Sequence, residues 1–172
     1  LTPPAWHREN FARLAGGLAG AVDEVVVSFI QVYRKTRRNL DRAAGVHGFA
    51  WRDPDDGEKG ELLAGLAAVA AGHGMRLTLC GQPRLLGENI GEARCIDVER
   101  LADVAGRPVE AARKSHRAGC ACARSTDIGA YDTCPHGCAY CYAVADRERA
   151  KQRVAALDPA ADSLSPVRTP TS

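Results

Sequence analysis

Two short apolar runs alternate with segments of helical periodicity, and this alternation constrains the fold more than any other feature of the chain. The first run, EVVVSFIQ, covers 24–31 and is rich in β-branched residues. The second run, MRLTLC, covers 75–80. Runs that are apolar on both faces are typical of strands in a parallel sheet that is covered on both sides. The alternation therefore predicts an α/β fold with a parallel sheet.

Helices are expected around these runs. Apolar residues recur at helical spacing from Phe11 to Val22, and Thr2 and Pro3 suit the N-cap and the first turn of that helix. A second helix contains Leu62 and Leu66 and ends at the glycines of 72–74. Further helical segments are predicted at 32–45 (in part), 97–104, 108–116 and 142–157.

Two strands are too few for a stable sheet. Leu1 opens the chain and Met75 is its only methionine, so we expect the chain to be the later part of a longer polypeptide, truncated at its N-terminal side. Residues 1–118 are predicted to form the later βα units of a partial βα barrel or of an open parallel sheet. A cysteine-rich segment with a C-terminal helix is expected over 119–157, and a disordered tail over 158–172.

In both architectures, functional sites collect at the carboxyl ends of the strands. This rule predicts that Tyr33, Arg34, Lys35 and Cys80 lie at the functional rim of the sheet. Arg34 and Lys35 are therefore candidates for binding a phosphate or carboxylate group of a substrate. The alternative is that the basic run YRKTRR forms a solvated helix face.

Charge and hydropathy narrow the class of partner. The formal net charge is only +2, which gives no strong signal for a nucleic-acid or acidic-membrane partner. No apolar run approaches the roughly 20 residues of a transmembrane helix, and the first residues lack the layout of a signal peptide. The sequence therefore predicts a cytoplasmic protein with no membrane partner.

Seven cysteines are present, and five of them lie between Cys120 and Cys141. An odd number without a secretory signal favours metal binding over a disulfide framework. Cys134, Cys138 and Cys141 have the spacing C-x(3)-C-x(2)-C. Thiolates suit iron–sulfur clusters, zinc and Cu(I). A structural zinc site needs four protein ligands, whereas three thiolates on a four-iron cluster leave one iron open.

The local sequence predicts how this loop is built. Pro135 and Gly137 suit a tight turn, and Cys138 and Cys141 are expected to project from the first turn of the charged helix, where backbone N–H groups stabilise thiolates. A zinc site would need a fourth ligand such as His136, Asp132 or another cysteine.

The other four cysteines form a second candidate group. Four thiolates would complete a second iron–sulfur cluster or a structural zinc site, with His116 as a substitute ligand. Buried cysteine is also an ordinary small apolar residue, and this alternative is strongest for the first member. The group consists of Cys80, Cys95, Cys120 and Cys122.

The segment CPHGCAYC resembles the cysteine signature of the radical S-adenosylmethionine (SAM) enzymes. The wider stretch CACARSTDIGAYDTCPHGCAYCYA, with VVVSFIQVYRKTRRN and CIDVERL, resembles an uncharacterised bacterial family, domain of unknown function 1848, over most of 1–143. The C-terminal cysteine cluster of that family is likened to the radical SAM signature.

The radical SAM resemblance implies a [4Fe-4S] cluster on Cys134, Cys138 and Cys141 whose open iron chelates SAM. It also implies a small-molecule substrate of unknown identity and an electron donor such as a flavodoxin or ferredoxin. Tyr140 is then a candidate to pack over the cluster or an adenine ring, and Asp127 and Tyr131 to orient a ligand; the alternative for Asp127, Tyr131 and Asp132 is a turn or cap role. A second hypothesis is a non-catalytic metal module for electron transfer or zinc binding.

Overall fold

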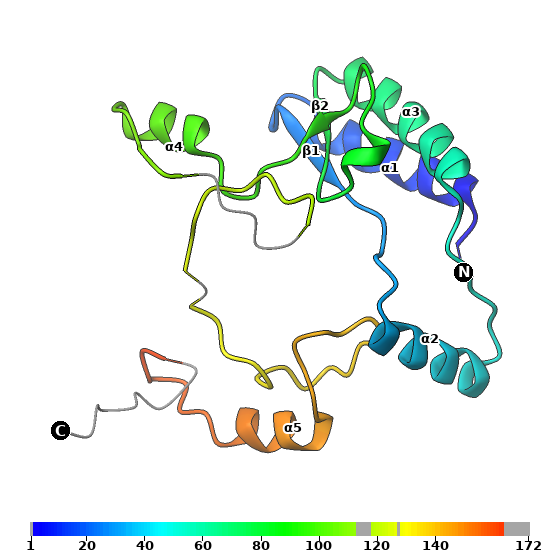
Figure 1. Cartoon of the computed structure of the whole chain (residues 1–172), viewed down its shortest axis with the longest axis vertical. Coiled ribbons are helices and arrows are strands. Elements are labelled where there is room, and N and C mark those ends of the chain that lie inside the picture. The colour runs from blue at the N-terminus through cyan, green and yellow to red at the C-terminus, as the bar shows by residue number, and fades with distance from the viewer. Residues whose placement is uncertain (1, 113–117, 127, 164–172) are drawn as a thin grey trace. The chain divides into compact units, whose positions relative to one another are not determined.

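The computed structural model describes residues 2–112, 118–126 and 128–163, and these residues fall into two compact units. The first unit consists of Leu1–Ile30 and Arg52–Ser125, and the second of Gln31–Trp51 and Thr126–Ser172. Figure 1 shows the course of the chain through both units. The predicted domain boundaries after residues 118 and 157 stay predictions.

The first unit contains an open sheet of three parallel strands in the order β1-β2-β3. The strands are β1 (Glu24–Val27), β2 (Arg76–Leu79) and β3 (Gly91–Glu92). Glu24 pairs with Arg76, and Thr78 pairs with Gly91. This sheet confirms the α/β prediction. The sequence did not predict β3, because its two residues carry no strand periodicity.

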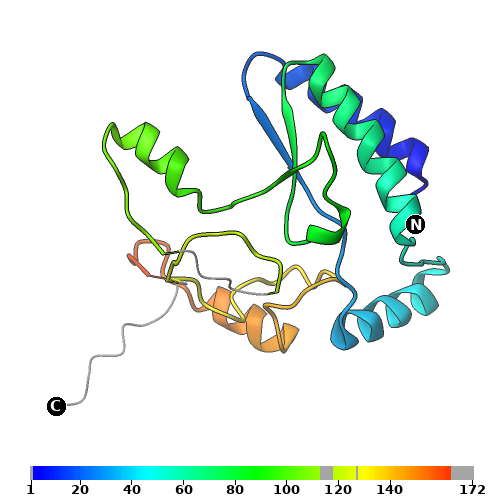
Figure 2. The same ribbon diagram turned by 45° about the horizontal axis from the view of Figure 1, so that its top comes forward.

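Two helices of the first unit lie side by side on the same side of the sheet, as Figures 1 and 2 show. They are α1 (Pro4–Leu18) and α3 (Asp56–Gly72), and both confirm predicted helices. The core between them and the sheet is made of Ala15, Leu62, Leu63, Leu66, Ala67, Ala70, Met75, Leu77 and Leu79. The helical periodicity of the apolar residues therefore determines which helix faces cover the sheet.

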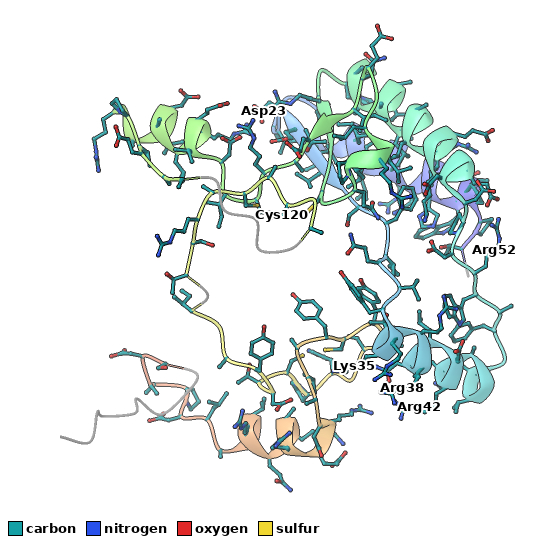
Figure 3. The ribbon with its side chains drawn as sticks, viewed as in Figure 1. Asp23, Lys35, Arg38, Arg42, Arg52 and Cys120 are labelled. Atoms are coloured by element: carbon teal, nitrogen blue, oxygen red, sulfur yellow. The ribbon has the colours of Figure 1, made fainter. Side chains whose placement is uncertain are left out.

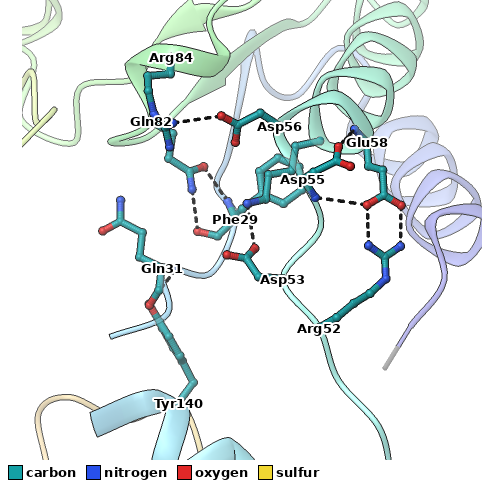
Figure 4. A network of polar contacts seen from close by, with 11 residues as sticks. Phe29, Gln31, Arg52, Asp53, Asp55, Asp56, Glu58, Gln82, Arg84 and Tyr140 are labelled. Atoms are coloured by element: carbon teal, nitrogen blue, oxygen red, sulfur yellow. Dashed lines mark hydrogen bonds and ion pairs between the residues drawn. The ribbon is translucent and has the colours of Figure 1, made fainter. Parts of the chain in front are cut away.

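The first predicted strand ends earlier than expected, at Val27 instead of Gln31. The side-chain amide of Gln82 accepts a hydrogen bond from Phe29 N at 2.9 Å and donates one to Phe29 O at 3.2 Å (Figure 4). Gln82 thus takes the backbone groups that a continuing strand would use. The prediction that both faces of β1 are buried is also wrong, because the side chain of Val26 is 52% exposed.

Several predicted helix ends differ from the observed ones in the first unit. Pro3 takes the N-cap position of α1 and Pro4 its first position, instead of Thr2 and Pro3. The predicted helix at 97–104 is α4 (Val98–Ala105), capped by the Asp97 carboxylate, and η1 (Pro83–Leu85) is a short 3-10 turn. Residues 108–112 are not helical, and the rest of the helix predicted at 108–116 lies outside the described residues.

The second unit contains the helices α2 (Arg34–His47) and α5 (Arg147–Ala155). α2 confirms a helix in the basic segment and ends at Gly48, whose φ of 66° requires the left-handed conformation that glycine adopts easily. α5 begins later than the predicted residue 142. Residues 158–161 form a turn in which Ala161 N donates to Asp158 O at 3.1 Å, and the last nine residues of the predicted tail lie outside the described residues.

The N-terminus of α3 predicts an acid-dependent loss of stability. Asp55 and Glu58 form a capping box, and both carboxylate oxygens of Glu58 accept hydrogen bonds of 2.5 Å from Arg52 (Figure 4). The hydrogen bonds from Arg52, followed by that from the Asp55 backbone, lower the pKa of Glu58 from 4.5 to about 2. Because the pKa of Glu58 is lower in the folded chain than in the unfolded chain, the ionised carboxylate stabilises the folded chain above pH 4.5. This contribution is lost as the pH falls towards 2 and Glu58 becomes protonated.

We therefore expect Glu58→Gln to flatten the decrease in unfolding free energy between pH 4.5 and 2.5, because glutamine keeps the backbone contact and loses the charge. Urea denaturation at a series of pH values measures this slope. Glu61→Gln, an exposed position one turn later on α3, is the matched control. Equal slopes for Glu58→Gln and the parent chain would contradict the prediction.

Candidate metal centres

The C-x(3)-C-x(2)-C segment forms a loop in the second unit that Asp132 closes at its base. Asp132 N donates to Ala143 O at 3.1 Å, and Asp132 Oδ1 accepts from Ala145 N at 2.6 Å and from Asp146 N at 3.4 Å. The two hydrogen bonds to the carboxylate, the one from Ala145 N first and then the one from Asp146 N, lower the pKa of Asp132. Asp132 has a φ of 56°, which aspartate tolerates better than most residues. Both ends of the segment containing the three cysteines are therefore joined.

Cationic side chains surround this cysteine loop. Arg147 Nε donates to Pro135 O at 3.4 Å, Arg149 Nη2 lies 3.4 Å from Asp132 Oδ2, and Arg153 Nη1 donates to Tyr131 O at 2.9 Å. From α2, Lys35 Nζ donates to Val144 O at 3.0 Å. Four cationic side chains therefore hold the backbone of this loop and the Asp132 carboxylate at its base.

The turn inside the loop depends on Gly137. Its φ is 69°, and a Cβ atom at this position would lie 2.5 Å from Arg147 Nε. A side chain would therefore be strained by the backbone and would collide with the guanidinium group. The chain bends at His136, within the tight loop that Pro135 and Gly137 predict, and Arg147 occupies the space where a side chain at position 137 would lie.

Tyr140 fastens the loop to the segment that precedes α2. Its hydroxyl donates to Gln31 O at 3.0 Å and accepts from Gln31 N at 3.2 Å (Figure 4). The phenol therefore satisfies both backbone groups of one residue. Its packing over a cluster or an adenine ring stays a prediction.

The three thiols of the loop are accessible. Cys134 and Cys138 are exposed, and Cys141 is half-buried. No group of three or more histidine, cysteine, aspartate or glutamate side chains within the described residues is arranged to hold a metal ion. The fit of this loop to a metal therefore rests on its donor chemistry, three soft thiols in one closed loop, and on the cations around it.

The expected helical position of two of these cysteines is wrong. α5 begins at Arg147, after the loop, and Asp146 is its N-cap, with its carboxylate accepting from Arg149 N at 2.9 Å. Cys138 and Cys141 therefore do not lie in the first helical turn. Ala143, Ala145 and Asp146, which lie between Cys141 and α5, form backbone hydrogen bonds with Asp132 instead. The sequence predicts Asp132 as a turn or cap residue or as a fourth zinc ligand, and does not predict these contacts.

The other candidate site residues are basic, aromatic, acidic and histidine side chains outside the two groups of cysteines. Lys35, Arg38 and Arg42 follow one another along α2 (Figure 3). Arg34 is exposed, and Tyr131 is 59% exposed. The argument that placed Arg34 and Lys35 at the sheet rim relied on a strand reaching Gln31, which is wrong. Asp127 and His116 lie outside the described residues.

The other four cysteines all belong to the first unit. Cys80 directly follows β2, as the sequence predicts, and side-chain hydrogen bonds connect Cys95 to Cys80 and Cys122. Burial, followed by the two neighbouring thiols, raises the pKa of Cys95 to about 11. Cys120 lies in the same loop as Cys122 (Figure 3). All seven cysteines of the chain are present as thiols and none is in a disulfide.

Asp132 offers a direct test of loop closure. We expect Asp132→Ala to weaken the binding of a thiophilic metal by the loop about 10- to 100-fold, the usual effect of removing a group that orients metal ligands. Asp132→Asn is the matched control, because asparagine keeps the acceptor oxygen and tolerates a positive φ. Competition with a chromogenic chelator measures the affinity. Equal affinities of the two variants would show that closure by Asp132 does not matter.

Within the described residues, no helix has both the length and the apolar character needed to cross a membrane.

Comparison with known proteins identifies the family of the chain. Neither the curated proteins nor the solved structures include a match to the chain. A family model described as a domain of unknown function, DUF1848, matches residues 1–143, which include the parallel sheet and all seven cysteines. The chain therefore belongs to the DUF1848 family.

Proposed function

We propose that the chain is an iron–sulfur protein with radical SAM-like chemistry, whose [4Fe-4S] cluster is bound by Cys134, Cys138 and Cys141. The observation that carries this proposal is the closed loop itself. Three thiols occur on one loop, and hydrogen bonds of Asp132 to Ala143, Ala145 and Asp146 join its two ends. The proposed place of action is the cytoplasm, because a reducing compartment keeps metal-binding cysteines from forming disulfides.

The charges around the loop support an anionic cluster. Cationic side chains form hydrogen bonds with the backbone of the loop. Arg147 donates to the carbonyl oxygen of Pro135, and Lys35 donates to that of Val144. Their positive charge would stabilise an anionic cluster held by the loop.

The number of ligands supports an open coordination position. Cys134, Cys138 and Cys141 would hold three irons of a four-iron cluster, and such a cluster would supply the electron for reductive cleavage of SAM. The chain's own part is to hold the loop and to present polar groups beside it. Arg34 at the start of α2 is a candidate for a carboxylate or phosphate group of a ligand, and Tyr131 is an exposed aromatic residue at the base of the loop.

Turnover by such a site needs an external electron donor, such as a flavodoxin or ferredoxin, and a small-molecule substrate. The exposure of Cys134 and Cys138 favours a cluster close to the surface, where an electron donor would reach it.

A second candidate function is a non-catalytic metal site, either a structural zinc site or an electron-transfer cluster. One observation favours it: His136 lies in the same loop and is exposed, so its imidazole is available as a fourth ligand. The two candidates differ in metal, in sulfide content and in response to SAM.

Anaerobic metal analysis and electron paramagnetic resonance (EPR) separate these candidates. The full chain and the variant C134S/C138S/C141S are purified and reconstituted in parallel, and iron, sulfide and zinc are measured per chain. We expect the parent chain to exceed the variant by about four irons and four sulfides, and SAM to change the EPR spectrum of the reduced parent. An iron difference without a SAM effect would favour electron transfer. A difference of about one zinc without sulfide would overturn the iron–sulfur proposal.

A further inference from the structure

Two of the four cysteines of the first unit lie beyond the carboxyl ends of two neighbouring strands. Cys80 follows β2, and its N–H donates to Val27 O at 2.9 Å. Cys95 follows β3, where Ala93 N donates to Leu79 O at 3.0 Å. Because parallel strands end at the same edge of a sheet, the chain leaves both strands on the same side, with these two cysteines beyond the strand ends.

The loop that carries Cys120 and Cys122 is held against both of these segments. Ala123 N donates to Ile96 O at 3.0 Å, next to Cys95. On the other side, Gly119 has a φ of 76°, and a Cβ at this position would lie 2.8 Å from Pro83 Cδ and 3.4 Å from Gly81 O. Only glycine allows so close an approach here. The loop is therefore fixed at one end beside Cys80 and at the other end beside Cys95.

Side-chain contacts complete this arrangement. The side chain of Cys95 forms hydrogen bonds with the side chains of both Cys80 and Cys122. Cys122 is buried, and Cys80 and Cys120 are half-buried. Cysteines used only as small apolar residues have no reason to meet one another, yet here thiols from three separate segments do. The contact of three thiols favours a common ligand.

We propose that Cys80, Cys95, Cys120 and Cys122 form a second metal site, in which four thiolates bind a thiophilic metal centre, either one zinc ion or a closed four-iron cluster. The Cys95 thiol is hydrogen-bonded to the thiols of Cys80 and Cys122. Metal binding would release the thiol protons and replace these hydrogen bonds by metal–sulfur bonds. Four protein ligands leave no open position, so the site is structural or electron-carrying. It connects the segments after β2, after β3 and after α4.

This site is independent of the cysteine loop in the second unit, and the test separates the two. The full-length variant C134S/C138S/C141S is purified without added metal, and a second variant adds C95S and C122S to it. We expect the first variant to retain either about one zinc, or about four irons with equal sulfide, and the second to lose this metal. The metal that is found decides between zinc and a cluster.

Two results would overturn the proposal. One is an absence of stoichiometric zinc and iron from C134S/C138S/C141S, and the other is metal that persists after C95S and C122S are added. After its bound metal has been removed with a chelator, C134S/C138S/C141S is titrated with Co²⁺, which gives a readout that does not depend on the folding of the second variant. Intense thiolate-to-cobalt absorption at one equivalent is expected, and its absence also contradicts the site. Far-UV circular dichroism checks that both variants fold.

Discussion

Replacing Cys138 by serine is expected to remove about four irons per chain and to abolish any change that SAM produces in the EPR spectrum of the reduced protein. Cys138 is the middle ligand of the proposed set and is exposed in a loop whose ends Asp132 joins. Serine has nearly the same size and removes only the soft donor atom. The loss is measured relative to the parent chain reconstituted in the same way.

His136→Ala is the matched control for this prediction. It lies two residues away in the same loop and is equally exposed. A cluster on three thiolates does not use His136, so its iron content and its response to SAM are expected to stay unchanged. Loss of metal in both variants would show that His136 is a fourth ligand and would favour the non-catalytic metal module.

Replacing Leu63 by alanine is expected to lower the unfolding free energy by about 2–5 kcal/mol, the usual range for a buried leucine. Leu63 lies on α3 and is 1% exposed, within the core that α1 and α3 form with the sheet. Its removal leaves a cavity that the neighbouring side chains fill only in part. Urea denaturation followed by circular dichroism measures the change.

Val104→Ala provides the control for Leu63. Val104 lies on α4 in the same unit and is 86% exposed, so we expect a change within about 0.5 kcal/mol. A small effect of Leu63→Ala, comparable to that of Val104→Ala, would mean that the helices are not packed against the sheet as described.

The positions of the helices and of the two longer strands could be predicted from the sequence, because their signals are local. The β-branched run before Val27 and the apolar periodicity around Leu62 each act within a few residues. The end of β1 could not be predicted, because Gln82, far away in the sequence, binds the backbone of Phe29. The two-residue strand β3 exists only by pairing with β2.

For the cysteine loop, the sequence predicts the donor atoms and their spacing, together with the turn at Gly137. It does not predict that Asp132 closes the loop, since that depends on Ala143 and Ala145 returning to its side. The predicted start of the last helix, residue 142, is too early for the same reason, because α5 begins at Arg147. Helical propensity is a local property, and it does not show that the backbone N–H groups of Ala145 and Asp146 are hydrogen-bonded to Asp132.

By itself, the sequence determined the thiol donors and their spacing, including C-x(3)-C-x(2)-C, and the α/β scaffold to which they are attached. Only the tertiary structure decided which of the other cysteines meet. Cys80 and Cys95 follow the parallel strands β2 and β3, and the loop of Cys122 is held beside Cys95 by the hydrogen bond from Ala123 N to Ile96 O. Spacing along the chain determines local donor geometry, whereas contacts between distant residues depend on strand pairing and loop packing.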